Sequence, residues 1–132
     1  MSDERRFLDD FESGRMPEEG FGHREHVRAA WLVLRDCPAA EAIARFTAAL
    51  QRFAAARGRP DLYHETVTWA FLLLVRERRA RGGAGEGWED FVARNPDLMS
   101  WKPSVLDAYY TRETLSSELA RRCFVFPDRI PA

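Results

Sequence analysis

The sequence predicts an all-α protein, a compact bundle of about four main helices followed by short C-terminal helices. Apolar residues recur at intervals of three and four along most of the chain, which is the spacing of one face of a helix. They almost nowhere alternate over several residues, as they would in a half-buried β-strand. A length of 132 residues fits one domain, and no internal repeat or long polar linker divides it. We therefore expect a single helical domain over residues 1–132.

Three helices are predicted in the first half of the chain. A short amphipathic helix around residues 7–11 ends at Gly14. A second helix begins near His23 and stops before Pro38, because a proline ring blocks its continuation. A third, with an apolar stripe along one side, covers residues 39–56.

The fourth predicted helix, residues 62–79, is apolar around most of its circumference, which is typical of a helix at the centre of a bundle. Asp61 is its expected N-cap. Four arginines crowd its C-terminal end, where we expect them to cap the helix and solvate it; they are Arg76, Arg78, Arg79 and Arg81. The glycine-rich stretch 82–87 matches no phosphate-binding motif and is expected to be a loop.

The rest of the chain predicts short helices. One starts at Trp88, and a helical piece carries residues 105–110. The last helix is expected to place Leu115, Leu119 and Cys123 on one face. Its expected N-cap is Thr111 or Ser117, because a hydroxyl side chain can accept a backbone N–H at the start of a helix.

Composition excludes several classes of function. The 20 basic residues are balanced by 21 acidic ones, so the net charge of -1 provides no large positive field that would attract the phosphates of a nucleic acid. No run approaches the roughly 20 apolar residues of a membrane span, so no membrane partner is expected. The N-terminal residues lack the apolar middle of a signal peptide, and Cys37 and Cys123 form no metal-binding or disulfide pattern. We expect a cytoplasmic protein with two ordinary thiols.

The 3 histidines all fall in two short motifs, His23-Arg-Glu-His26 and Tyr63-His64-Glu65-Thr66. Residues three apart lie on nearly the same face of a helix, so His23 and His26 can converge. Both are in phase with the apolar stripe of the second helix. His64 is in phase with Val67 and Phe71 on the fourth helix, so the sequence predicts that all three rings point inward.

Buried imidazole rings require partners, because an unpaired buried polar group costs on the order of 1–3 kcal/mol. Three imidazoles and a carboxylate suit a divalent transition metal such as zinc, iron, manganese or nickel. The first hypothesis is therefore a metal site with His23, His26 and His64 as ligands and Glu65 as the catalytic base. The expected pocket, which binds a small-molecule ligand, is completed by Tyr63, Glu25, Trp31 and Trp69.

A second hypothesis is a non-catalytic interaction protein or homo-oligomer whose histidines are structural. Glu65 then only favours the helix dipole. An exposed aromatic patch would dock a partner or a second copy; its expected members are Trp88, Trp101, Tyr109 and Tyr110. A third hypothesis is a pH sensor, because grouped imidazoles titrate near neutral pH.

The two motifs carry a family resemblance. The pattern Phe21-x-His23-x-x-His26-Val27-x-x-Ala30-Trp31, then Tyr63-His64-Glu65-Thr66-x-Thr68, then Tyr109-Tyr110 and Phe124 to Asp128, resembles a family of small uncharacterised bacterial all-helical proteins. The resemblance covers almost the whole chain. It implies that His23, His26, His64 and Glu65 belong to the signature of that family, and it implies no substrate or reaction.

Overall fold

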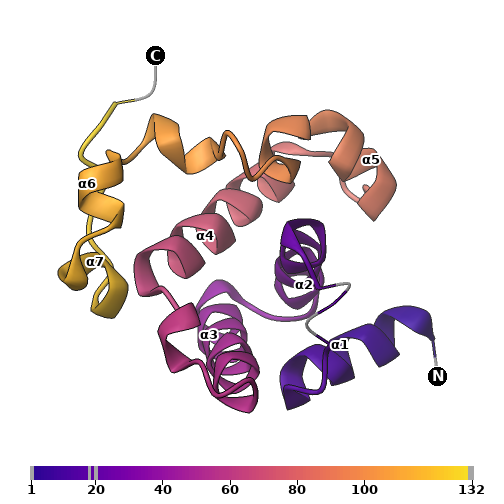
Figure 1. Cartoon of the computed structure of the whole chain (residues 1–132). Helices are drawn as coiled ribbons and strands as arrows, with labels where there is room; N and C mark the ends of the chain where they lie inside the picture. Colours follow the sequence, from indigo (N-terminus) through magenta and orange to yellow (C-terminus); the bar gives the residue numbers. More distant parts are fainter. Residues whose placement is uncertain (1, 18, 20, 131–132) are drawn as a thin grey trace. The chain divides into compact units, whose positions relative to one another are not determined.

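The computed structural model describes residues 2–17, 19 and 21–130, and within these ranges every regular element is a helix (Figure 1). The one β-type pairing in the described residues is an isolated bridge between Trp101 and Ser104. The prediction of an all-α protein with four long helices and several short ones is confirmed. The contacts group the chain into two units, Met1–Tyr63 and His64–Ala132. The single domain expected over residues 1–132 stays a prediction, and each unit is described by itself.

The first unit contains three long helices and one short 3₁₀ helix: α1 (Asp3–Ser13), α2 (His23–Asp36), α3 (Ala39–Ala56) and η1 (Pro60–Leu62). Ser2 caps α1, because its hydroxyl oxygen accepts the backbone N–H of Arg5 at 3.1 Å. Gly14 ends the same helix in the left-handed conformation, at φ 78°. The predicted start at His23 and the predicted range 39–56 are confirmed.

Four phenylalanines form the centre of the first unit. The ring centroid of Phe11 lies 5.6 Å from that of Phe21 and 5.5 Å from that of Phe46. The centroids of Phe21 and Phe53 are 4.9 Å apart. Because aromatic rings bury large apolar areas and pack best at these separations, the cluster holds α1, α3 and the residues just before α2 together.

Arginines of α3 and of the residue that ends it fasten the end of α1. Arg45 holds both carboxylate oxygens of Glu12 in a two-pronged ion pair. Arg52 donates to the backbone oxygen of Glu12 at 2.5 Å, and Arg57 donates to the backbone oxygen of Met16 in the following turn. The last carbonyl groups of a helix lack partners within it, so these cationic donors stabilise the C-terminal end of α1.

The second unit is built around one long helix. Its elements are α4 (Glu65–Arg81), α5 (Trp88–Arg94), η2 (Pro96–Met99), η3 (Val105–Ala108), α6 (Arg112–Leu115) and α7 (Glu118–Arg122). Ala70 and Phe71 of α4 form a buried cluster with Leu106 and Tyr110, and the C-terminal residues Phe124 and Val125 pack against it. This buried cluster therefore lies between α4 and the chain that follows η2.

Two predicted helix boundaries are wrong. The fourth helix begins at Glu65 instead of residue 62, and its cap is His64 instead of Asp61. His64 has extended backbone angles, φ -134° and ψ 112°, because Asp61 belongs to a separate 3₁₀ turn that ends before it. The expected last helix is divided into α6 and α7, because the chain turns at Ser116 and Ser117 caps the second piece. Thr111 caps α6, so both predicted caps are used.

Arg78 does more than cap or solvate the end of α4. Its guanidinium group donates to both carboxylate oxygens of Asp97, at 2.9 and 2.8 Å, and to the amide oxygen of Asn95 at 2.9 Å. Asn95 is 2% exposed, so its amide oxygen depends on this donor. The arginine therefore fastens η2 to α4 through charge-assisted hydrogen bonds.

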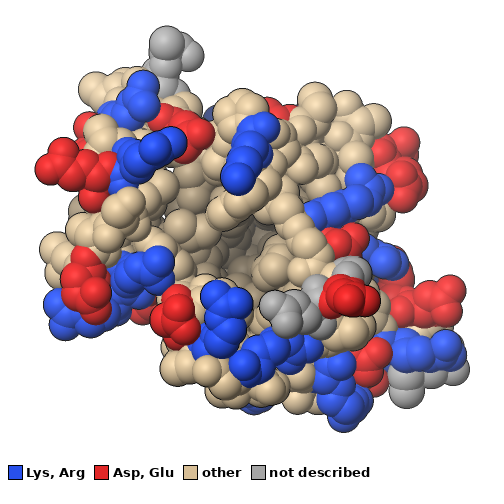
Figure 2. Space-filling view, in the orientation of Figure 1, with Lys and Arg blue, Asp and Glu red and all other residues tan. Residues whose placement is uncertain are grey.

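Charged side chains of both signs are interspersed over the face seen in Figure 2. None of the helices in the described ranges is both long and apolar enough to cross a membrane.

Candidate functional site

The first histidine motif builds the N-terminal turn of α2. The backbone N–H of Gly22 donates to Oε1 of Glu25 at 2.8 Å, so Glu25 serves as a capping residue. Nδ1 of His26 lies 2.8 Å from the backbone oxygen of Gly22. A carbonyl oxygen can only accept, so this contact places a proton on Nδ1. The ring centroid of His26 lies 4.2 Å from that of Phe21, against which the imidazole packs.

Burial is the main cause of the shifted pKa of His26. It lowers the pKa of the imidazole below the ordinary value of 6.5, and the neighbouring His23 lowers this pKa further. The hydrogen bond to Gly22 and the charge of Glu25 oppose the shift. The balance favours a neutral ring, which suits its packing on Phe21.

The second motif builds the N-terminal turn of α4. Nδ1 of His64 accepts the backbone N–H of Val67 at 3.1 Å, and Nε2 lies 2.7 Å from the backbone oxygen of Leu115. These contacts define one tautomer, with the proton on Nε2 and the lone pair of Nδ1 used by the helix. Neither ring nitrogen of His64 has a lone pair left for a metal ion in this arrangement. The ring instead ties the start of α4 to the end of α6.

Thr66, a residue of the same motif, makes a second link. Its hydroxyl donates to the backbone oxygen of Cys123 at 3.0 Å and accepts the backbone N–H of Val125 at 3.2 Å. The side chain is fully buried. Tyr110 contributes a third link, because its phenol donates to the backbone oxygen of Val125 at 2.8 Å. Burial raises the pKa of this phenol, which stays protonated as the donor.

Asp128 completes the attachment of the C-terminal segment. Its carboxylate accepts the backbone N–H and the hydroxyl of Thr111, at 3.0 and 2.8 Å, and the hydroxyl of Thr114 at 2.7 Å. The hydrogen bond from Thr114, followed by those from Thr111, holds the pKa of Asp128 below its usual range. The sequence analysis assigned no role to Thr66 or Asp128. Both residues nevertheless belong to the motifs that carry the family resemblance.

The other predicted site residues are divided between the units. Glu25 and Trp31 lie on α2, and Tyr63 follows η1, all in the first unit. Glu65 is the first residue of α4, where its charge favours the helix dipole. Trp69 lies one turn further along, and its ring stacks on Phe124 with the centroids 5.7 Å apart. The expected pocket shared by all of them stays a prediction.

The described residues contain no group of three or more histidine, cysteine, aspartate or glutamate side chains placed to hold a metal ion. His23 and His26 belong to the first unit and His64 begins the second. The expected ligand set of His23, His26 and His64 draws on both units, so it stays a prediction.

A polar hollow of about 840 Å³ lies elsewhere in the first unit, and it is lined by Ser2, Glu4, Arg5, Leu8, Arg35, Asp36 and Arg45. Arg35 donates to Glu4 and to Asp36, at 2.9 Å each. The lining arginines Arg35 and Arg45 are thus held by carboxylates of the protein itself. None of the predicted site residues lines this hollow.

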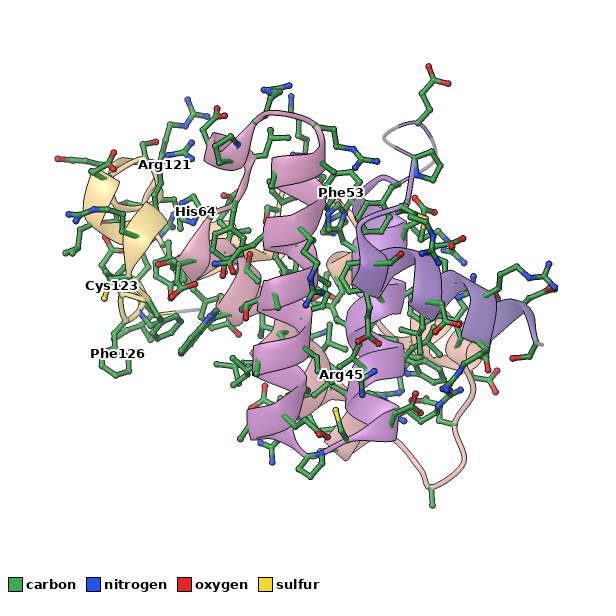
Figure 3. The ribbon with its side chains drawn as sticks, turned by 90° about the horizontal axis from the view of Figure 1, so that it is seen from below. Arg45, Phe53, His64, Arg121, Cys123 and Phe126 are labelled. Carbon is green, nitrogen blue, oxygen red and sulfur yellow. The ribbon has the colours of Figure 1, made fainter. Side chains whose placement is uncertain are left out.

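Of the predicted exposed aromatic patch, Trp101 is exposed, and Trp88 and Tyr109 are half-buried. The prediction is wrong for Tyr110, which is only 2% exposed. Its ring is part of the core of the second unit, where the phenol has a backbone partner. The large apolar side chains that the second unit does expose include Trp101, Leu119, Phe126 and Ile130. Figure 3 shows Phe126 with Cys123 and His64, which belong to the same unit.

Comparison with protein-family models, curated proteins and solved structures found no match to this chain. The family resemblance of its motifs stays a prediction.

Proposed function

We propose that the protein is a non-catalytic interaction protein whose histidines are structural. The observation that carries this proposal is that both ring nitrogens of His64 are hydrogen-bonded to the backbone, Nδ1 to the N–H of Val67 and Nε2 to the oxygen of Leu115. A metal ligand needs a free lone pair on one ring nitrogen. Using His64 as a ligand would uncap α4 or release the contact with Leu115.

The first motif supports the same interpretation. Nδ1 of His26 and the carboxylate of Glu25 both pair with the backbone of Gly22. The carboxylate of Glu25, a residue of the expected pocket, is therefore engaged in capping α2. Glu25, His26 and His64 are thus used to begin two helices.

Exposed apolar side chains supply the interaction surface. Phe126 is 83% exposed and Ile130 is 95% exposed, and both belong to the C-terminal segment that the second unit holds in place. Large apolar side chains on a fastened segment are typical of surfaces that bind another protein.

Metal analysis of protein purified without a histidine tag tests the proposal. The expected result is much less than one equivalent of zinc, iron, manganese or nickel, with the same unfolding curve before and after treatment with a chelator. One equivalent of a metal, together with a loss of stability on chelation, would overturn the proposal in favour of the metal pocket of His23, His26 and His64. Loading the apoprotein with each metal in turn, followed by the same unfolding measurement, controls for metal lost during purification.

A further inference from the structure

The polar hollow of the first unit is lined by arginines from three helices. Arg5 lies on α1, Arg35 on α2 and Arg45, which is labelled in Figure 3, on α3. The apolar side chain of Leu8 also lines the hollow, which has a volume of about 840 Å³. Pockets that hold small molecules have volumes of about 300–1,000 Å³, so there is room for a compact ligand.

Carboxylates of the protein orient two of these arginines. Nε of Arg35 donates to Asp36, and Nη1 of the same residue donates to Glu4, at 2.9 Å each. Nε and Nη2 of Arg45 donate to the two carboxylate oxygens of Glu12. A long side chain loses rotamer freedom when it binds a ligand, and these ion pairs have already fixed both guanidinium groups. The hollow is therefore preorganised.

Both held arginines keep donors for a ligand. A guanidinium group has five N–H donors, and the carboxylates use only part of them. In the described part of the chain, Nη2 of Arg35 has no hydrogen-bond partner. Nη1 of Arg45 has only the thiol of Cys37, a weak acceptor, at 3.7 Å. Arg5 is more open still, because its side chain is 68% exposed and its ion pair with Asp9 is loose, at 4.0 Å.

The charge of the lining favours an anion. Three of the seven lining residues are arginines and two are acidic, Glu4 and Asp36. Glu12 holds Arg45 from outside the lining. The forked donors of arginine match the oxygen atoms of phosphate and carboxylate groups. A phosphate monoester suits three guanidinium groups better than a carboxylate does, because it offers three acceptor oxygens instead of two.

We propose that this hollow binds a small molecule that carries a phosphate monoester. The phosphate accepts hydrogen bonds from Arg5, Arg35 and Arg45, and the rest of the ligand lies over Leu8. Such a site goes beyond the interaction role proposed above, because it uses none of the exposed apolar side chains of the second unit. The neighbouring carboxylates offset part of the attraction, so we expect a dissociation constant on the order of 1 mM that rises with salt.

Titration of the full chain with inorganic phosphate tests the proposal, with the Nε–H signals of the arginines followed by NMR. The pH is fixed by a buffer without phosphate, and sodium chloride keeps the ionic strength constant. We expect the signals of Arg35 and Arg45 to shift and to saturate. Glycerol phosphate should bind at least as tightly, and acetate, the carboxylate comparison, should bind more weakly.

Two equally exposed arginines provide a matched pair of variants. Arg5→Gln removes a lining charge without breaking a close ion pair, and should weaken phosphate binding about fivefold. Arg15 is also 68% exposed and is loosely paired with Asp10, at 3.5 Å, but it does not line the hollow. Arg15→Gln should therefore leave the dissociation constant unchanged.

Substitutions of Arg35 test the forked donor. Arg35→Gln should weaken phosphate binding about tenfold, because it removes a held cation. Arg35→Lys keeps the charge but loses the fork, so its dissociation constant should lie between those of Arg35→Gln and the unchanged chain.

Three results would overturn the proposal. The first is an absence of saturable shifts at phosphate concentrations well above the expected dissociation constant. The second is an equal loss of affinity in Arg5→Gln and Arg15→Gln, because the attraction would then come from the surface charge in general. The third is acetate binding as tightly as phosphate, which would exclude a phosphate monoester as the preferred ligand.

Discussion

Replacing His64 by alanine tests the assignment of a structural role to this ring. The substitution removes the N-cap of α4, which costs about 1 kcal/mol in typical helices. It also removes the donor to the backbone oxygen of Leu115, and a hydrogen bond of this kind contributes about another 1 kcal/mol. We therefore expect His64→Ala to lower the free energy of unfolding by about 2 kcal/mol.

His64→Asn separates the two contributions. The asparagine side chain is a good N-cap and can accept the N–H of Val67, but it is too short to replace the imidazole at Leu115. We expect about half the loss seen for alanine. Ser117→Ala is a matched control, because the hydroxyl of Ser117 caps α7 by accepting the N–H of Ala120, at 3.1 Å, without a link to a distant segment.

Urea unfolding at one fixed pH, followed by far-UV circular dichroism, measures all three variants. The reasoning about His64 would be refuted if His64→Ala lost less than about 0.5 kcal/mol, which is below the usual cost of losing a cap. It would also fail if His64→Asn were no more stable than His64→Ala, because the ring would then not act as a cap.

Three further variants probe the same contacts. Thr66→Val keeps the shape of a fully buried side chain but removes its bridging hydroxyl, and should cost about 1–3 kcal/mol in urea unfolding, whereas Thr66→Ser should cost less. The lowered pKa of His26 means that the unfolded chain binds the proton more tightly than the folded one. The free energy of unfolding should therefore fall as pH drops through the ordinary value of 6.5 toward the folded-state pKa. His26→Asn should make the free energy of unfolding depend less on pH in this range, and an unchanged pH dependence would contradict the assignment. Asp128→Asn weakens the acceptor for Thr111, so the amide of Thr111 should exchange faster in NMR experiments, with no change at Val67 as the internal control.

Much of the fold follows from local patterns in the sequence. The apolar stripe of α3, its start after Pro38, and the start of α2 at His23 depend on residues within a few positions of one another, and all were predicted. Helix periodicity and proline stereochemistry act locally, which is why a single sequence suffices for them. The start of α4 was misplaced because a histidine cap is not a strong local signal.

The candidate site depended on contacts that no local pattern contains. The sequence by itself determined that His64 stands beside a helix start and that it needs a hydrogen-bond partner. The tertiary structure decided that this partner is Leu115, 51 residues further along the chain. Likewise, helical phase predicted an inward His64 in a metal pocket, but one residue outside the helix the phase no longer applies. A buried polar group must be satisfied, and only the folding of distant segments against one another decides by what.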